Sequence, residues 1–203
     1  MLIVLIILIV TVVFISSFYA YYYFSGRAAK KRLIANLEQL AATTQMENSQ
    51  LQSVASPALS GRYRAHDFYV EAAQKRSGTK KMDFWRISAE QEIDVADRFY
   101  IQGEKREGKL RKVVGLDVIT TGDELFDQRV LVFASDKSLA RRIFGPYMRE
   151  RFLWLALNDF AIELDGRSCV MEIYLSPPTS VRSIRHSMEV MTELMNVIRT
   201  VAV

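Results

Sequence analysis

The first twenty-four residues, Met1 to Phe24, contain no charged side chain and constrain this chain more than any other stretch. They read MLIVLIILIVTVVFISSFYAYYYF. A helix of this length spans roughly 36 Å at about 1.5 Å per residue, which is enough to cross the hydrocarbon core of a bilayer with some tilt. The sequence therefore predicts a transmembrane anchor over residues 1–24 and a folded domain after it.

A cleaved signal peptide is the alternative interpretation of this stretch, and the sequence opposes it. No Lys or Arg precedes the apolar run, and the run is longer than the apolar region of about 7–15 residues that signal peptides carry. Ala20 is the nearest candidate for a cleavage site, but Phe18 stands where a small residue is needed. Four nearby residues are instead typical of an interfacial aromatic belt: Tyr19, Tyr21, Tyr22 and Tyr23.

The orientation of the anchor follows from the charges around it. Four candidate membrane-surface residues come directly after the apolar run: Arg27, Lys30, Lys31 and Arg32. The positive-inside rule then predicts a single-pass inner-membrane protein whose carboxyl-terminal domain is cytoplasmic. These cations can also attract anionic lipid, by about 1 kcal/mol each near the surface, or can act only as a stop-transfer signal.

Residues 25–60 are predicted to be a basic juxtamembrane helix followed by a polar linker. Leu33, Leu37 and Leu40 share one face of the predicted helix, which can continue the membrane helix, lie on the surface, or pair with a second copy. The stretch TTQMENSQLQSVASPALSG after it is polar and rich in small residues, which predicts a flexible tether. Residues 61–203 remain for one domain with a single core.

The first half of this domain is predicted to be an antiparallel meander. Three stretches suggest strands, namely residues 63–74, 81–89 and 98–102, with a turn around Gly78 and an exposed loop over residues 103–109. The interval 109–122 is ambiguous, because no single period explains its apolar residues, which are Val113, Val114, Leu116, Val118 and Ile119. From Gly122–Asp123, a turn leads to an almost wholly apolar and therefore central strand over residues 130–134.

The second half mixes helices with two further strands. Asp136 stands where an N-cap belongs, ahead of a helix over residues 137–144, and Pro146 suits the first turn of a second helix. Asp165–Gly166 predicts a two-residue turn between strands at 160–164 and 167–176. The last segment, residues 179–200, has an apolar stripe at helical spacing. We therefore predict the α+β class: an antiparallel sheet with helices packed on one side.

Residues 122–175 resemble a bacterial domain family of unknown function that occurs in membrane-anchored proteins. The likeness lies in GDELFDQRVLVFASD, the Ala140–Arg141 pair, Pro146, Met148 and the predicted turn at residues 165–166. Relatives often have two amino-terminal spans, whereas this sequence has one. Because the family has no assigned activity, the resemblance implies the architecture only.

The best candidates for a functional site in the sequence are three acidic residues, Asp123, Glu124 and Asp127. Three carboxylates on a loop can hold a divalent cation, and the sequence makes these residues weak metal candidates. The regular acidic spacing of a helix-loop-helix calcium site is absent from them. The structural alternative is that Asp123 shapes the turn and that Asp127 pairs with a cation or accepts backbone hydrogen bonds.

Other polar residues do not assemble into a predicted catalytic or cofactor site. His66 and Asp67 are neighbours in a predicted strand, so their side chains point to opposite faces. Cys169 is interpreted as a small core residue. Two histidines and one cysteine cannot form the usual zinc site without carboxylates, and no glycine-rich phosphate loop is present. These observations disfavour an enzyme.

The net charge of the chain and the methionines of residues 179–200 indicate which kinds of partner the domain can bind. The net charge is +4, and four of the cations stand at the predicted membrane exit, so the domain is close to balanced and is not predicted to bind nucleic acid. Met188, Met191 and Met195 can pack on the sheet or accept a partner, including a second copy. We therefore predict a membrane-anchored, non-catalytic interaction domain. The alternative is a membrane-tethered metal-dependent enzyme or binder using Asp123, Glu124 and Asp127.

Overall fold

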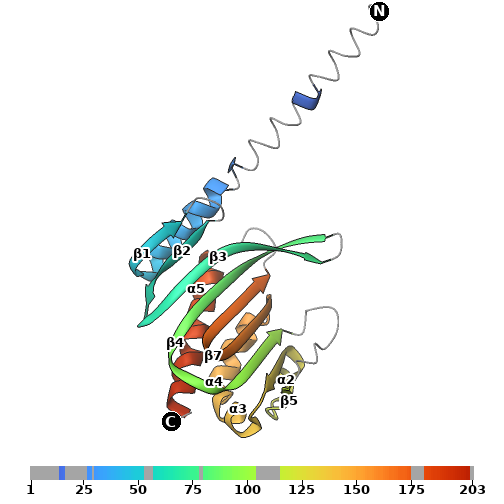
Figure 1. Cartoon of the computed structure of the whole chain (residues 1–203). Helices are drawn as coiled ribbons and strands as arrows, with labels where there is room; N and C mark the ends of the chain where they lie inside the picture. The colour runs from blue at the N-terminus through green and yellow to red at the C-terminus, as the bar shows by residue number, and fades with distance from the viewer. Residues whose placement is uncertain are drawn as a thin grey trace, which may run out of the picture.

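The computed structural model of the chain describes residues 14–16, 27–28, 30–52, 57–77, 80–103, 115–174 and 181–201. Within these ranges the chain has the predicted α+β class, an antiparallel sheet with helices behind it (Figure 1). The predicted anchor lies outside the described residues except for 14–16, which are helical. Among the residues described, no helix is long and apolar enough to span a bilayer.

Seven labelled strands form the sheet, and β4 is its centre. The strands are β1 (Glu47–Gln52), β2 (Ala58–Tyr63), β3 (His66–Ser77), β4 (Lys80–Gly103), β5 (Asp117–Ile119), β6 (Val130–Ala134) and β7 (Asp159–Tyr174). Their order is β1-β2-β3-β4-β6-β5, and β7 pairs with β4. All these pairings are antiparallel.

β4 curves around β7. Between the pairs Glu90↔Ser168 and Phe99↔Leu164, β4 advances nine residues while β7 advances four. β4 therefore follows the outer path of a bend whose inner side lies at the predicted turn, where Gly166 has φ +59° (Figure 1). The separate strands predicted at 81–89 and 98–102 are thus two ends of one continuous, bent strand.

The predicted juxtamembrane helix is present over residues 30–44, and Leu37 and Leu40 are fully buried in the core of the domain. The stretch after this helix, which the sequence analysis assigned to a flexible tether, is instead folded in its described residues. The polar residues after the helix form β1 and β2 at the edge of the sheet. Every residue of β1 is exposed, so its composition resembles that of a linker although its backbone pairs with β2.

The interval around residues 115–129 also differs from expectation. Residues 117–119 form β5, the short strand that pairs with β6. Glu124–Arg129 form a helix, α2, which the sequence analysis did not assign. β6 occupies the predicted residues 130–134, and four of its five side chains are buried.

The two helices that follow begin as predicted. α3 (Lys137–Ile143) is capped by Asp136, whose Oδ1 accepts hydrogen bonds from the amides of Ser138 and Leu139 at 2.7 and 3.1 Å. α4 (Pro146–Leu155) has its proline in the first turn, where a missing N–H leaves no helical hydrogen bond unmade. Both helices therefore have local signals that agree with the fold.

One hydrophobic core joins the sheet to the helices. Val70, Ile87 and Met171 are register partners on three neighbouring strands, and all three are fully buried. α5 (Val181–Val201) buries its apolar stripe in the same core, including Met188, Met191 and Met195. The stripe thus packs within the chain, as one of the two predicted alternatives requires.

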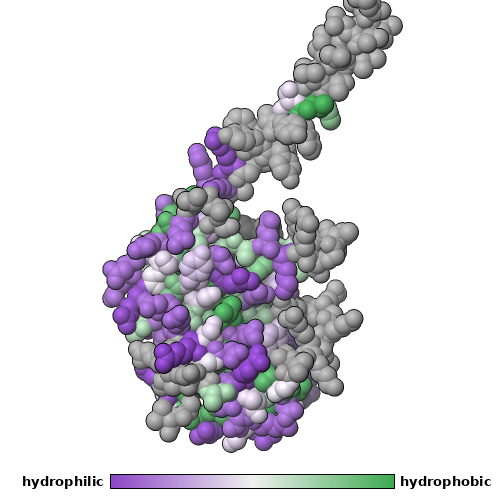
Figure 2. All heavy atoms as spheres, viewed as in Figure 1, coloured by the Kyte–Doolittle hydropathy of each residue, from purple (hydrophilic) through white to green (hydrophobic). Residues whose placement is uncertain are grey.

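The other face of the sheet carries cross-strand ion pairs and a small apolar cluster. Arg86 of β4 lies 3.4 Å from both Glu71 of β3 and Glu172 of β7. Tyr100, Phe133 and Ala161 cluster near the opposite end of β4. Figure 2 shows hydrophilic and hydrophobic side chains intermingled on the side of the molecule that faces the viewer.

Candidate functional site

The acidic residues singled out in the sequence lie around the start of α2. Asp123 is the N-cap of this helix, since its Oδ1 accepts a hydrogen bond from the amide of Phe126 at 3.2 Å. Its other oxygen lies 3.3 Å from Nη1 of Arg149. Glu124 accepts a hydrogen bond from Gln128 Nε2 at 3.2 Å. Two of the three carboxylates therefore stabilise the helix and its contact with α4.

Asp127 holds the loop that precedes α2. Its carboxylate accepts hydrogen bonds from the amide of Thr121 at 3.0 Å, from the Thr121 hydroxyl at 2.9 Å and from the amide of Gly122 at 3.1 Å. Gly122 has φ +83°, a conformation that glycine adopts without strain. No group of three or more acidic, His or Cys side chains arranged for a metal ion occurs among the described residues.

His66, Asp67 and Cys169 are placed as the sequence suggested. His66 is buried with Nε2 3.4 Å from Oδ1 of Asn196, while Asp67 is exposed. Cys169 is fully buried, and burial raises the pKa of its thiol to about 12. A thiol with such a pKa stays protonated at neutral pH, so Cys169 is not suited to act as a nucleophile.

A concave surface lies elsewhere, where three helical segments meet. We call it the α4–α5 groove, and its volume is about 840 Å³. Its lining comes from the end of helical residues 30–44, from the end of α4 with the turn after it, and from the first turns of α5. The lining residues are Gln39, Thr43, Arg151, Trp154, Leu155, Leu157, Asn158, Val181, Arg182, Ser183, Arg185, His186 and Glu189.

Trp154 and Leu157 supply the apolar part of this groove, and their side chains are 59% and 57% exposed. The exposure of Trp154 follows from its position in α4. Phe152 to Leu155 are four consecutive apolar residues, and a helix with 3.6 residues per turn cannot direct all of them into one core. Phe152 and Leu155 are buried, so Trp154 points outward.

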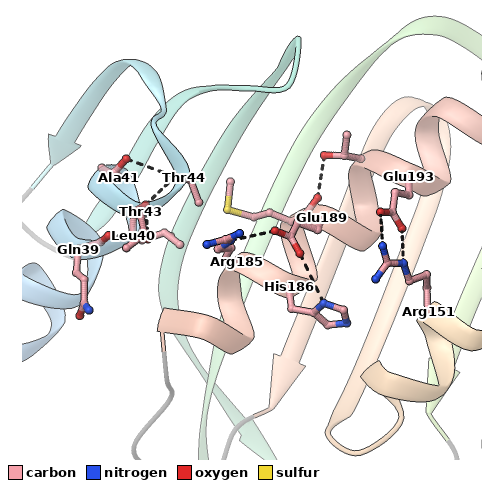
Figure 3. A network of polar contacts seen from close by, with 12 residues as sticks. Gln39, Leu40, Ala41, Thr43, Thr44, Arg151, Arg185, His186, Glu189 and Glu193 are labelled. Carbon is pink, nitrogen blue, oxygen red and sulfur yellow. Dashed lines mark hydrogen bonds and ion pairs between the residues drawn. The ribbon is translucent and has the colours of Figure 1, made fainter.

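A polar network borders the groove along α5 (Figure 3). Nε of Arg185 lies 2.9 Å from Oε1 of Glu189, whose Oε2 lies 3.8 Å from Nδ1 of His186. This hydrogen bond to Glu189 raises the pKa of Arg185, which therefore stays charged. The His186 ring meets Trp154 edge to face with centroids 6.2 Å apart, and its buried Nε2 has no hydrogen-bond partner among the described residues.

The end of helical residues 30–44 forms the opposite wall. The hydroxyls of Thr43 and Thr44 donate to the carbonyls of Gln39 and Leu40 at 2.8 and 2.6 Å (Figure 3). Gln45 then takes φ +52°, a left-handed conformation of the kind that terminates helices. This wall is therefore a helix C-terminus at which the threonine hydroxyls already donate hydrogen bonds within the helix.

A second, smaller groove of about 440 Å³ adjoins the first and shares Thr43 and Arg185 with it. Its lining adds Arg62 from the end of β2 and Arg64 from the turn between β2 and β3. Together the two grooves are lined by five arginines and two glutamates. This excess of positive charge stands out because the domain as a whole was expected to be nearly neutral.

None of the residues that the sequence analysis singled out for chemistry lines this groove. Trp154 could have been found from the run of four apolar residues in α4, since at least one of them had to face solvent. Arg182 and Arg185 carried no comparable signal. They lie more than 130 residues along the chain from Gln39 and Thr43, which form the opposite wall.

Comparison with known proteins identifies a similar fold and no family. No family model and no curated protein matches this sequence. The crystal structure of the mycobacterial trehalose monomycolate transport factor A, TtfA, is similar with a TM-score of 0.54 and 8% sequence identity. The match covers 83% of this chain and 96% of that one, far more than residues 122–175. The chain is therefore similar in fold to a bacterial transport factor, over nearly the whole of that factor's structure.

Proposed function

We propose that this chain is a single-pass inner-membrane protein whose cytoplasmic domain is a non-catalytic docking module for a partner protein. The observation that carries the proposal is the α4–α5 groove, where exposed Trp154 and Leu157 stand beside Arg182 and Arg185. Tryptophan and arginine are the residues most enriched among the strong contributors to protein interfaces. The groove thus has the composition of a binding surface.

Membrane attachment is supported by the uncharged run of residues 1–24 and by the four cations after it. The helical residues 30–44 begin beside these cations and end at the groove, with Leu37 and Leu40 buried in the domain. The groove is therefore held at a set position relative to Lys30, Lys31 and Arg32, which suits a protein that presents a binding surface to another membrane-associated protein.

The kind of process is suggested by the fold. Because TtfA is described as a transport factor for trehalose monomycolate, we place the proposed docking module in the transport of an amphipathic envelope lipid. In this proposal the chain recruits or positions another component of the transport machinery. It is not itself required to perform a reaction, which accords with the structural roles of Asp123, Glu124 and Asp127.

Two experiments test the proposal in intact cells. A fluorescent protein that folds only in the cytoplasm should fluoresce when fused after Val203, and a dark fusion together with an active exported reporter would refute the orientation. A photo-crosslinking amino acid at Leu157 should capture a defined protein. The same amino acid at Val118, which is also exposed but lies on the sheet, should not capture it. Equal capture at both positions, or capture only of a second copy, would contradict a partner-specific groove.

A further inference from the structure

The charges of the α4–α5 groove specify the chemistry of what it binds. The Arg182 side chain has no hydrogen bond or ion pair within the described part of the chain, and it is exposed. Arg185 contacts Glu189 through Nε. In the adjoining groove, Arg62 donates to a backbone carbonyl, that of Ala65, and Arg64 lies over the Tyr63 ring. Arg62, Arg64 and Arg182 thus have no carboxylate partner among the residues described.

An occupant that complements this surface needs carboxylates and a bulky apolar side. Guanidinium groups bind carboxylates through paired hydrogen bonds, and this recognition is strong where water is partly excluded. Trp154 and Leu157 line the same groove as Arg182 and Arg185. An apolar side chain placed on Trp154 would cover surface that water now contacts, which is the main source of affinity at such sites.

The described lining also indicates the secondary structure of the occupant. The α4–α5 groove is lined by helix ends and the turn after α4, and no strand edge of the described sheet contributes to it. An occupant therefore has no strand edge in this lining to which it could add a strand. An amphipathic helix, which satisfies its own backbone hydrogen bonds and presents side chains at i, i+3, i+4 and i+7, fits such a surface.

The position of the groove favours a protein segment over a lipid headgroup of the bilayer. Thr43 in the groove wall lies thirteen positions along the helix from Lys30, which is at the predicted membrane surface. At about 1.5 Å per residue this is roughly 20 Å along the helix, which is about twice the screening length of charges at physiological ionic strength. Headgroups would therefore meet Arg27 and Lys30 to Arg32 before they met Arg182.

We propose that the α4–α5 groove binds an acidic amphipathic helix of the partner protein. Its apolar side chains would lie against Trp154 and Leu157, and its carboxylates would pair with Arg182 and Arg185. This inference rests on the proposed docking function and adds the chemical class of the segment that docks.

The test measures binding of designed helical peptides to the full chain in detergent. The first probe is an 18-residue fluorescent peptide with leucine and phenylalanine on one face and glutamate on its flanks. Two matched probes replace every glutamate with glutamine or with lysine, and anionic vesicles form a separate arm. We expect binding of the glutamate peptide only, and weaker binding as salt rises from 50 to 300 mM, since the charges lie at the rim.

Two variants of exposed groove residues sharpen the test. Trp154→Ala should weaken binding of the glutamate peptide by about tenfold or more. Arg182→Glu should weaken it similarly and should raise affinity for the lysine peptide. Leu125→Ala, at an exposed residue of α2 outside the groove lining, and Lys137→Glu, a charge reversal on α3, are the matched controls and should leave binding unchanged. Unchanged thermal midpoints would show that all four variants fold.

The possible results separate the inference from the function on which it rests. Equal binding of all three peptides, or a response to Arg182→Glu no larger than to Lys137→Glu, would overturn the acidic-helix proposal. Binding of anionic vesicles that depends on Arg182, without peptide binding, would replace it with lipid recognition. If the Leu157 crosslink captures a partner while no glutamate peptide binds, the docking function stands and the acidic-helix inference fails.

Discussion

Arg151 of α4 and Glu193 of α5 form a two-contact ion pair that joins the two helices beside the groove. Nη2 of Arg151 donates to Oε1 of Glu193 at 3.0 Å, and Nε lies 2.9 Å from Oε2. The arginine side chain is 35% exposed and the glutamate 16%, so water screens the pair only in part. This geometry makes the pair a contributor to the stability of the groove.

Removal of the glutamate charge should measure this contribution. We expect Glu193→Gln to lower the free energy of unfolding by about 1–2 kcal/mol, more than a fully exposed pair and less than a buried one. Denaturant titration of the full chain in detergent gives the value. Asp117→Asn, which breaks the exposed 3.1 Å pair with Lys137, is the control and should cost no more than about 0.5 kcal/mol. Equal costs would contradict the distinction.

Phe152 should be among the most sensitive core positions. It lies between Phe144 and Phe160, with ring centroids 5.4 and 6.1 Å away, and it is fully buried. Phe152→Ala should therefore destabilise the domain by about 3–5 kcal/mol through lost packing and an unfilled cavity. Trp154→Ala, two residues along the same helix but exposed, should cost less than about 1 kcal/mol. Thermal unfolding of both variants checks this contrast.

Leu40 tests whether helical residues 30–44 belong to the folded domain. Its side chain is fully buried in the main core cluster. Leu40→Ala should lower the free energy of unfolding by about 2–5 kcal/mol, whereas Glu38→Ala on the exposed side of the same helix should have little effect. A flexible tether would make both substitutions neutral. Limited proteolysis should likewise leave this segment intact until the domain unfolds.

Substitution of Asp127 distinguishes a structural role of the acidic residues from a role in metal binding. Asp127→Ala removes acceptors for three donors of Thr121 and Gly122, and should cost about 2–3 kcal/mol. Because these oxygens are already engaged, Ca²⁺, Mg²⁺ and Mn²⁺ should leave the thermal midpoint of the full chain unchanged. A ligand of the native state must raise that midpoint, so a rise that disappears in Asp127→Ala would support a metal site.

The buried thiol of Cys169 should make the folded chain less stable at alkaline pH. Burial raises the pKa of its thiol from 9.0 to about 12, so between these values the unfolded state loses the proton while the folded state retains it. The stabilisation is complete below pH 9 and falls by up to about 4 kcal/mol as pH rises toward 12. Burial also raises the pKa of Tyr63, which acts in the same direction. Cys169→Ala should flatten the fall in unfolding free energy between pH 9 and 11. In the native chain the thiol should resist Ellman-type reagents.

The sequence predicted those elements that begin at a characteristic residue, such as an N-cap or a first-turn proline, or that consist of an unbroken apolar run. Asp136 and Pro146 marked the starts of α3 and α4, and the buried run of residues 130–134 marked β6. β1 had no such mark. Its six residues are all exposed, and its position depends on hydrogen bonds to β2, which local composition does not record. Polar edge strands and polar linkers therefore look alike in sequence.

The groove was harder to predict because its parts are distant in sequence. Gln39, Trp154 and Arg182 come from three helical segments that only the packing of the core brings together. The same is true of β4, whose bend depends on pairing with β7 some 75 residues later. Periodicity reports which face of an element is buried, but not which other element covers that face.

The burial of Leu37 and Leu40 has a mechanical consequence. Because one end of this helix is packed into the core, the helix and the domain rotate together about the helix axis. Each residue of an α-helix advances the chain by about 100°. One residue inserted after Arg32 would thus turn Lys30 and Lys31 by about 100° around the axis relative to the groove, while seven, close to two full turns, would bring them to within about 20° of their original direction. The number of residues between Arg32 and the end of the helix therefore sets the direction in which the membrane-proximal cations point relative to the groove.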